Sequence, residues 1–122
     1  MEFFKKTLAL SIVIASASIS FAQQGIACVK GINNDYSENG PYALPYYFID
    51  GDQLNEATNS YKYYGFNNYA VVIWPNGGYS AYEYYSFDSD ISSWSYEQVT
   101  DQNNRRAKIR RAPEYSSRCP DY

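Results

Sequence analysis

The sequence predicts an all-β protein, a small antiparallel sandwich or barrel of about five to seven strands that follows a signal peptide. Three observations lead to this fold class. Tyrosine occurs 15 times in 122 residues, and aromatic side chains favour the half-buried surface of a sheet. Asn, Asp, Gly and Pro recur at short intervals, as they do in the turns between short strands. No part of the chain after residue 22 carries a convincing long helical pattern.

The segment 69–85 predicts a central β-hairpin. Its apolar and aromatic residues flank Asn76-Gly77, a pair that accepts the positive φ angles of a two-residue turn. This turn would pair Trp74 with Tyr79 and leave both faces largely apolar, so we expect the hairpin to be covered on both sides. A turn at Gly77-Gly78 is the alternative, and it would shift the register of the two strands.

The rest of the mature chain predicts further short elements. A second hairpin is expected over 94–111, with its turn at 101–104 and with Ala107 and Ile109 on the inner face. Asp52 would cap a short helix. Three earlier strands are expected, at 26–30, 46–50 and 61–66.

Residues 1–22 have the pattern of a cleavable export signal. Two lysines stand near the start, an apolar run covers 8–19, and the small residues Ser20 and Ala22 precede the expected cut at Gln23. The run is too short to span a bilayer as a helix, which takes about 20 apolar residues. A buried N-terminal helix is the alternative, but the run has no polar face. We expect export to the periplasm or the medium of a bacterium, with no transmembrane segment in the mature chain.

Cys28 and Cys119 lie near the two ends of the mature chain, residues 23–122, which has the length of one domain. An even cysteine count in an exported protein predicts a disulfide. Closing so long a loop would contribute up to about 4–5 kcal/mol. Metal ligation fits less well, because the sequence has no histidine. Lipid modification of Cys28 is another alternative, but it would leave Cys119 without a partner.

The mature chain is mildly acidic. Removing residues 1–22 takes away two lysines and one glutamate, which leaves eight basic and twelve acidic side chains and a net charge of −4. A general nucleic-acid binder needs the opposite balance, because its affinity comes from neutralising phosphates. We therefore expect no nucleic-acid partner, and no motif in the chain predicts a cofactor.

Candidate catalytic and metal-binding groups are few. Without histidine the chain lacks the commonest general base, and oxidised cysteines supply no thiolate. Glu83 interrupts an apolar face and could serve a carboxylate-dependent hydrolase, although it would more simply reach solvent or an arginine. The carboxylates of Asp50 and Asp52, or of Asp88 and Asp90, could bind a hard cation or simply form turns. We expect a non-enzymatic protein without catalytic or metal-binding residues.

Two surfaces are candidates for binding. Tyrosine is enriched in binding sites, and a domain of this size cannot bury 15 tyrosines, although simple scatter over the surface is the alternative. The candidate tyrosines are Tyr61, Tyr63, Tyr64, Tyr82, Tyr84 and Tyr85. The second surface is basic: on a strand, Arg106, Lys108 and Arg110 would share one face, as an anion contact or as the charged face of an exposed strand.

These observations predict a small non-enzymatic binding module that acts through a tyrosine-rich β surface, as an inhibitor or immunity-like partner of another exported protein. The alternative is an accessory or structural protein of the cell envelope that contacts an anionic polymer through its basic strand. In size, strand content and disulfide the mature chain is similar to small exported inhibitors of cell-wall hydrolases. This is a similarity of architecture, without shared motifs, and it implies no residue roles.

Overall fold

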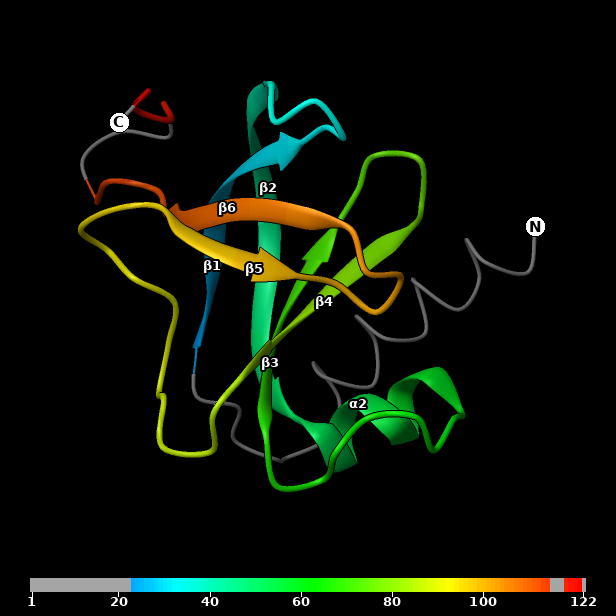
Figure 1. Cartoon of the computed structure of the whole chain (residues 1–122). Coiled ribbons are helices and arrows are strands. Elements are labelled where there is room, and N and C mark those ends of the chain that lie inside the picture. Colours follow the sequence, from blue (N-terminus) through cyan, green and yellow to red (C-terminus); the bar gives the residue numbers. More distant parts are fainter. Residues whose placement is uncertain (1–22, 115–117, 122) are drawn as a thin grey trace.

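The computed structural model describes residues 23–114 and 118–121, and the all-β fold class is confirmed (Figure 1). Within these residues six antiparallel strands form one nearly closed, barrel-like sheet, accompanied by one short helix that is neither long nor apolar enough to cross a membrane. The predicted signal peptide lies outside the described residues. The elements are β1 (Gln23–Ile32), β2 (Glu38–Asp50), α2 (Gly51–Thr58), β3 (Asn68–Ile73), β4 (Tyr79–Tyr84), β5 (Glu97–Thr100) and β6 (Arg106–Arg111).

The strand order β4-β3-β2-β1-β6-β5 makes the sheet an up-and-down meander whose two edge strands approach each other. β1 pairs with both β2 and β6, so the gap falls between β4 and β5. The Gln102 side chain bridges this gap: its Oε1 accepts a hydrogen bond from Ala81 N at 2.8 Å, and its Nε2 donates to Tyr79 O at 3.1 Å. The turns of the three hairpins, β1–β2, β3–β4 and β5–β6, lie at one end of the barrel, and the β2–β3 and β4–β5 connections lie at the other (Figure 1).

Two apolar clusters bury both faces of the sheet. The inner cluster receives side chains from all six strands and so fills the barrel: Ala27, Val29, Leu44, Tyr46, Phe48, Ala70, Val72, Tyr82, Ile91, Val99, Ala107 and Ile109. The outer cluster packs against α2: Ile49, Leu54, Ala57, Tyr63, Tyr69, Val71 and Ala81. Successive residues of β3 alternate between the two clusters, as the two-residue period of a strand requires.

The central hairpin is confirmed, but its register differs from the predicted one. Trp74 N donates to Gly78 O at 2.8 Å and Gly77 N donates to Trp74 O at 3.0 Å, so the loop holds three residues and neither expected turn occurs. Gly77 has a φ of 93°, the left-handed conformation that glycine adopts without strain and that three-residue hairpin loops use. Ile73, and not Trp74, therefore pairs with Tyr79. Both faces of the hairpin are buried, as expected.

The second hairpin has the predicted turn and inner face. In the turn between β5 and β6, the Asp101 carboxylate accepts hydrogen bonds from Asn103 N at 2.8 Å and Arg105 N at 2.9 Å. Ala107 and Ile109 are buried in the inner cluster. Two of the three earlier strands also occur, as parts of the longer β1 and β2.

The connection between β2 and β3 differs from the prediction in two ways. Residues 61–66 form a loop and not a strand. Asn55 of α2 holds this loop, because its side chain accepts a hydrogen bond from Tyr63 N at 3.0 Å and donates one to Tyr63 O at 2.8 Å. The helix cap is Asp50, whose carboxylate accepts a backbone hydrogen bond from the first helical turn at 2.8 Å, and not Asp52.

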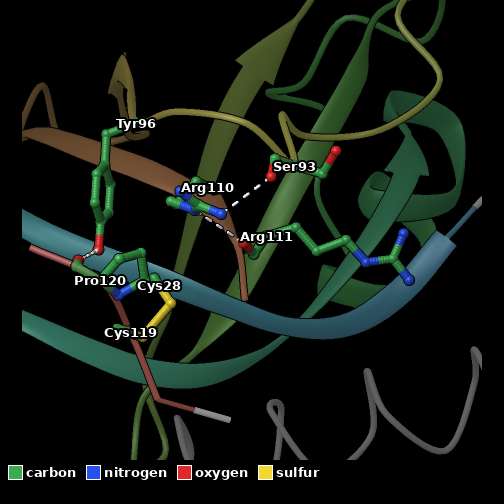
Figure 2. Close-up of a disulfide and its surroundings, with 7 residues drawn as sticks. All are labelled: Cys28, Ser93, Tyr96, Arg110, Arg111, Cys119 and Pro120. Carbon is green, nitrogen blue, oxygen red and sulfur yellow. Dashed lines mark hydrogen bonds between the residues drawn. A yellow bond between two sulfur atoms is a disulfide. The ribbon is translucent and has the colours of Figure 1, made fainter. Parts of the chain in front are cut away.

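The predicted disulfide between Cys28 and Cys119 is present (Figure 2). Cys28 is fully buried in β1, and the bond ties this strand to a segment 91 residues further along the chain. Beside it, Tyr96 OH donates a hydrogen bond to Pro120 O, so the same segment is also held to the β4–β5 connection (Figure 2). A disulfide of this kind indicates an oxidising, exported environment.

Candidate functional site

The candidate tyrosines do not form one exposed β face. Tyr82 is buried, and Tyr84 is half-buried with its ring edge-on to Phe48. Both side chains pack in the inner cluster, because closure of the sheet buries this face of β4, as the covered hairpin requires, and removes both tyrosines from the candidate surface. Tyr63 is buried in the outer cluster. The remaining candidates are exposed and lie in loops: Tyr61, Tyr64 and Tyr85.

The predicted basic face of β6 is not a continuous anion contact. Arg106, Lys108 and Arg110 alternate with the inward Ala107 and Ile109, as expected, but Arg110 is only 5% exposed. The β4–β5 connection crosses over Arg110 and covers it. Lys108 forms an ion pair with Glu38 and is not available as a free charge.

Arg110 fastens the β4–β5 connection to the barrel (Figure 2). Its Nε donates to Arg111 O at 3.1 Å, and its two terminal nitrogens donate to Trp94 O at 3.1 Å and Ser93 O at 3.0 Å. Among the residues that the structure describes, no carboxylate forms an ion pair with Arg110. The guanidinium therefore acts as a buried hydrogen-bond donor to the backbone.

Replacing Arg110 should destabilise the fold. We expect Arg110→Ala to lower the free energy of unfolding by about 2–4 kcal/mol, because three charge-assisted, partly buried hydrogen bonds to backbone carbonyl groups are lost. Arg106→Ala is the control: its guanidinium lies 4.8 Å from the Tyr36 ring, and its loss should cost about 1 kcal/mol or less. Urea unfolding measures both changes. Equal effects of the two substitutions would contradict the role given to Arg110.

Four exposed aromatic side chains gather at the end of the barrel opposite the hairpin turns. Tyr64 and Phe66 lie in the loop before β3, and Tyr85 and Phe87 follow β4; their exposed fractions run from 68% to 92%. The rings of Tyr85 and Phe87 stack, with centroids 5.4 Å apart and planes 7° from parallel. We call these four side chains the aromatic rim.

Two asparagines hold the loops of the aromatic rim against each other. Asn67 Nδ2 donates to Glu83 Oε2 at 2.7 Å, which joins the loop before β3 to the end of β4. Asn68 Nδ2 donates to Asp88 O at 2.7 Å, which joins the start of β3 to the loop after β4. The two loops that carry the aromatic rim are therefore held next to each other.

A cavity of about 410 Å³ opens beside the aromatic rim, in the gap between β4 and β5. We call it the acidic cavity, because three of its lining residues are carboxylates: Glu83, Asp88 and Glu97. In the described part of the chain none of the three pairs with a lysine or arginine. They accept hydrogen bonds from neutral donors instead, among them Tyr84 OH to Glu97 at 3.3 Å and Tyr85 N to Asp88 at 3.1 Å.

The three carboxylates give the acidic cavity a negative electrostatic field. Burial raises the pKa of the Tyr84 phenol above its usual range, and the nearby carboxylates of Glu97 and Asp88 raise it further. Glu83 also borders a second cavity, of about 310 Å³, to which Tyr64 and Lys62 contribute. Glu83 thus lies between the Tyr64 and Tyr85 sides of the aromatic rim.

Two of the other carboxylates considered in the sequence analysis have structural partners, and Asp52 lies in the first turn of α2. Asp50 caps α2, and Asp90 accepts hydrogen bonds from Tyr46 OH at 2.8 Å and pairs with Arg111 at 2.9 Å. Glu83 is exposed and accepts from Asn67 and Tyr69, and not from an arginine. Among residues 23–114 and 118–121, no three His, Cys, Asp or Glu side chains are grouped closely enough to hold a metal ion.

The sequence predictions missed Phe66 and Phe87, the two most exposed members of the aromatic rim. A signal for them exists, because each stands between turn-forming neighbours: Gly and Asn around Phe66, and Ser and Asp around Phe87. An aromatic residue within a turn has no sheet neighbour to cover it. The unpaired carboxylates had no comparable signal, since their proximity depends on the closed sheet.

No protein-family model matches this chain, and no significant similarity was found to a curated protein or to a solved structure.

Proposed function

We propose that the mature chain is a non-enzymatic binding module, exported to the periplasm or medium of a bacterium, and that its aromatic rim and acidic cavity bind a basic face of another exported protein. One observation carries this proposal. Four large aromatic side chains are exposed on two neighbouring loops, and one of them, Tyr85, lines a cavity with three carboxylates that have no cationic partner in the described chain. The apolar side chains of a partner would cover the aromatic rings, and its basic side chains would neutralise the carboxylates.

The size of the aromatic rim fits a protein interface. Each aromatic side chain can bury roughly 150–250 Å², so four of them supply roughly 600–1,000 Å². A standard interface buries about 800 Å² on each partner, and Tyr and Phe are enriched at its centre. Because Tyr85 and Phe87 are already stacked, binding would cost them little further loss of conformational freedom.

The acidic cavity favours a lysine or arginine of the partner. Such a side chain would meet the carboxylates of Glu83, Asp88 and Glu97 and the rings of Tyr84 and Tyr85. A cation near an aromatic face gains about 0.5–2 kcal/mol. Unpaired acidic groups also accelerate association with a basic partner by long-range attraction.

The alternative role, as a cell-envelope protein that contacts an anionic polymer, has less support. It depends on a row of free cations along β6. Arg110 is buried and Lys108 is paired with Glu38, so Arg106 is the member of that row left to meet a polymer.

Affinity capture with matched variants tests the proposal. The oxidised mature chain, immobilised, is exposed to periplasmic and secreted proteins of the native cell. We expect one stoichiometric partner, with Phe66→Ser and Phe87→Ser each weakening its binding by about 30-fold, the effect of losing an interface residue worth about 2 kcal/mol. Trp94→Ser is the control, because Trp94 is 86% exposed but lies outside the aromatic rim.

The contribution of the acidic cavity is tested separately, by the kinetics of association with the partner. Replacing Glu83, Asp88 and Glu97 by their amides should slow association and reduce its dependence on salt. Failure to capture any partner, or capture that Trp94→Ser and the two phenylalanine variants affect equally, contradicts the proposed function.

A further inference from the structure

Another cavity lies at the opposite end of the barrel, between the three hairpin turns; Figure 1 shows these turns at that end. Its volume is about 510 Å³, within the range of roughly 300–1,000 Å³ found for small-molecule sites, which often occupy the mouths of β-barrels. All three hairpins line it: β1–β2 through residues 31–34, β3–β4 through Trp74 and Ser80, and β5–β6 through residues 103–106. We call it the barrel-mouth cavity.

Side-chain amides dominate the wall of the barrel-mouth cavity. Its asparagines are Asn33, Asn34, Asn39, Asn103 and Asn104. Asn39 donates to Asn33 at 3.1 Å, which fixes two of them. In the part of the chain that the structure describes, the side-chain amides of Asn34, Asn103 and Asn104 make no hydrogen bond. Each amide offers an acceptor and two donors, so the wall can satisfy groups that both donate and accept.

Two arginines add positive charge to the barrel-mouth cavity. Neither Arg105 nor Arg106 forms an ion pair within the described residues, and Arg106 lies over the Tyr36 ring at 4.8 Å. The acidic side chain of the lining, Asp101, is buried and accepts hydrogen bonds from the backbone of its own turn. Two guanidinium groups are thus available to an anion in a protein whose overall charge is negative.

The inner part of the barrel-mouth cavity is aromatic. Tyr82 and Trp74 line it, and Trp74 is positioned by a 2.9 Å hydrogen bond from its indole nitrogen to Ser80 Oγ and by the edge of the Tyr42 ring. Aromatic surface of this kind can cover the C–H face of a sugar ring. Tyr82 is buried in the inner cluster, so the aromatic surface that a ligand can reach is that of the half-buried Trp74.

We propose that the barrel-mouth cavity binds an acidic saccharide, a short sugar chain that carries carboxylate groups. Sugar hydroxyls donate and accept hydrogen bonds as the asparagine side-chain amides do, the ring packs on Trp74, and the carboxylate meets Arg105 and Arg106. An apolar ligand would leave the amides without partners at a cost in free energy. A simple inorganic anion would use the guanidinium groups but leave the amide oxygens and aromatic rings unused. This site is separate from the aromatic rim and does not depend on the function proposed there.

Tryptophan fluorescence provides a direct test, because the sequence has two tryptophans and Trp74 belongs to the site. In a Trp94→Phe background the remaining signal comes from Trp74. Titration of the oxidised mature chain with trigalacturonate, an acidic trisaccharide, should change this signal saturably. Maltotriose, a neutral trisaccharide of the same length, should bind at least about tenfold more weakly, because it cannot engage the guanidinium groups.

Variants separate the parts of the proposed site. Arg105→Gln combined with Arg106→Gln should weaken trigalacturonate binding at least about tenfold and leave maltotriose binding unchanged. Asn103→Ala should weaken both sugars. Lys62→Gln, which removes a positive charge outside the cavity, should change neither, and circular dichroism checks that every variant is folded. No saturable response to trigalacturonate, or equal affinity for both sugars, overturns the proposal.

Discussion

Raising the pH above about 10 should unfold the protein cooperatively. Four tyrosines, Tyr46, Tyr63, Tyr82 and Tyr84, have phenol pKa values raised above the usual value near 10. In each, burial is the largest cause, because it disfavours the phenolate. For Tyr82 it raises the pKa to about 12, against a smaller opposing effect of a hydrogen bond from Ser80.

The direction of this effect follows from linkage. A group whose pKa is raised in the folded state stabilises the fold fully below its unfolded pKa and loses that contribution as pH rises toward the folded pKa. The loss begins near pH 10 and amounts to about 1.4 kcal/mol per pH unit for each tyrosine, or about 5.5 kcal/mol per unit for four. A small domain has about 5–15 kcal/mol of stability in total, so unfolding should be complete by about pH 12.

The substitution Tyr84→Phe tests the origin of the alkaline transition. It removes one raised phenol, so the pH midpoint of unfolding should rise and the slope should fall by about 1.4 kcal/mol per pH unit. Tyr85→Phe, which removes an exposed phenol, should leave the midpoint unchanged. Circular dichroism and the absorbance of tyrosinate report the transition together. Gradual ionisation of the buried phenols in a protein that stays folded would contradict this explanation.

Reducing the disulfide should have the next largest effect. Cys28 and Cys119 are 91 residues apart, and closing a loop of that length restricts the unfolded chain by about 4–5 kcal/mol. We expect reduction, or Cys28→Ala with Cys119→Ala, to lower the free energy of unfolding by that amount. For a domain of this size the midpoint of thermal unfolding should fall by about 20–35 °C.

Chemical reduction of the disulfide and the double substitution Cys28→Ala with Cys119→Ala serve as controls for each other. Reductant should destabilise the native protein but have no effect on the double-alanine variant, measured by urea unfolding at one pH. If the free energies of unfolding of the reduced and oxidised proteins differed by less than about 1 kcal/mol, the disulfide would contribute little to the stability of the fold. The C-terminal segment would then be held mainly by contacts such as Tyr96 OH to Pro120 O.

Local and long-range predictions were each confirmed in part. The two hairpins and the Cys28–Cys119 disulfide occur, whereas the strand expected at 61–66 is a loop and Asp50, not Asp52, caps the helix. The hairpin at 69–85 was predictable from its turn residues. Its register was missed because Pro75, with its fixed φ angle, shifts the turn by one position and gives a three-residue loop ending at Gly77. The two-residue period of a strand predicted which side chains share a face, but not which face is covered.

Closure of the sheet explains the errors in the candidate site. Tyr82 was expected on an exposed surface, but the meander curls until β4 approaches β5, and this places Tyr82 inside the barrel. Arg110 was expected to meet an external anion, but the connection that follows β4 crosses over it. Both outcomes depend on segments more than ten positions away in sequence, which no local pattern reports.

Hydrogen exchange on the complex with the captured partner tests most directly whether the aromatic rim and acidic cavity are the binding surface. The amides at 64–67 and 83–88 should exchange more slowly in the complex than in the free protein. Slower exchange confined to the three hairpin turns or to β6, with those two segments unchanged, would contradict the proposed binding surface.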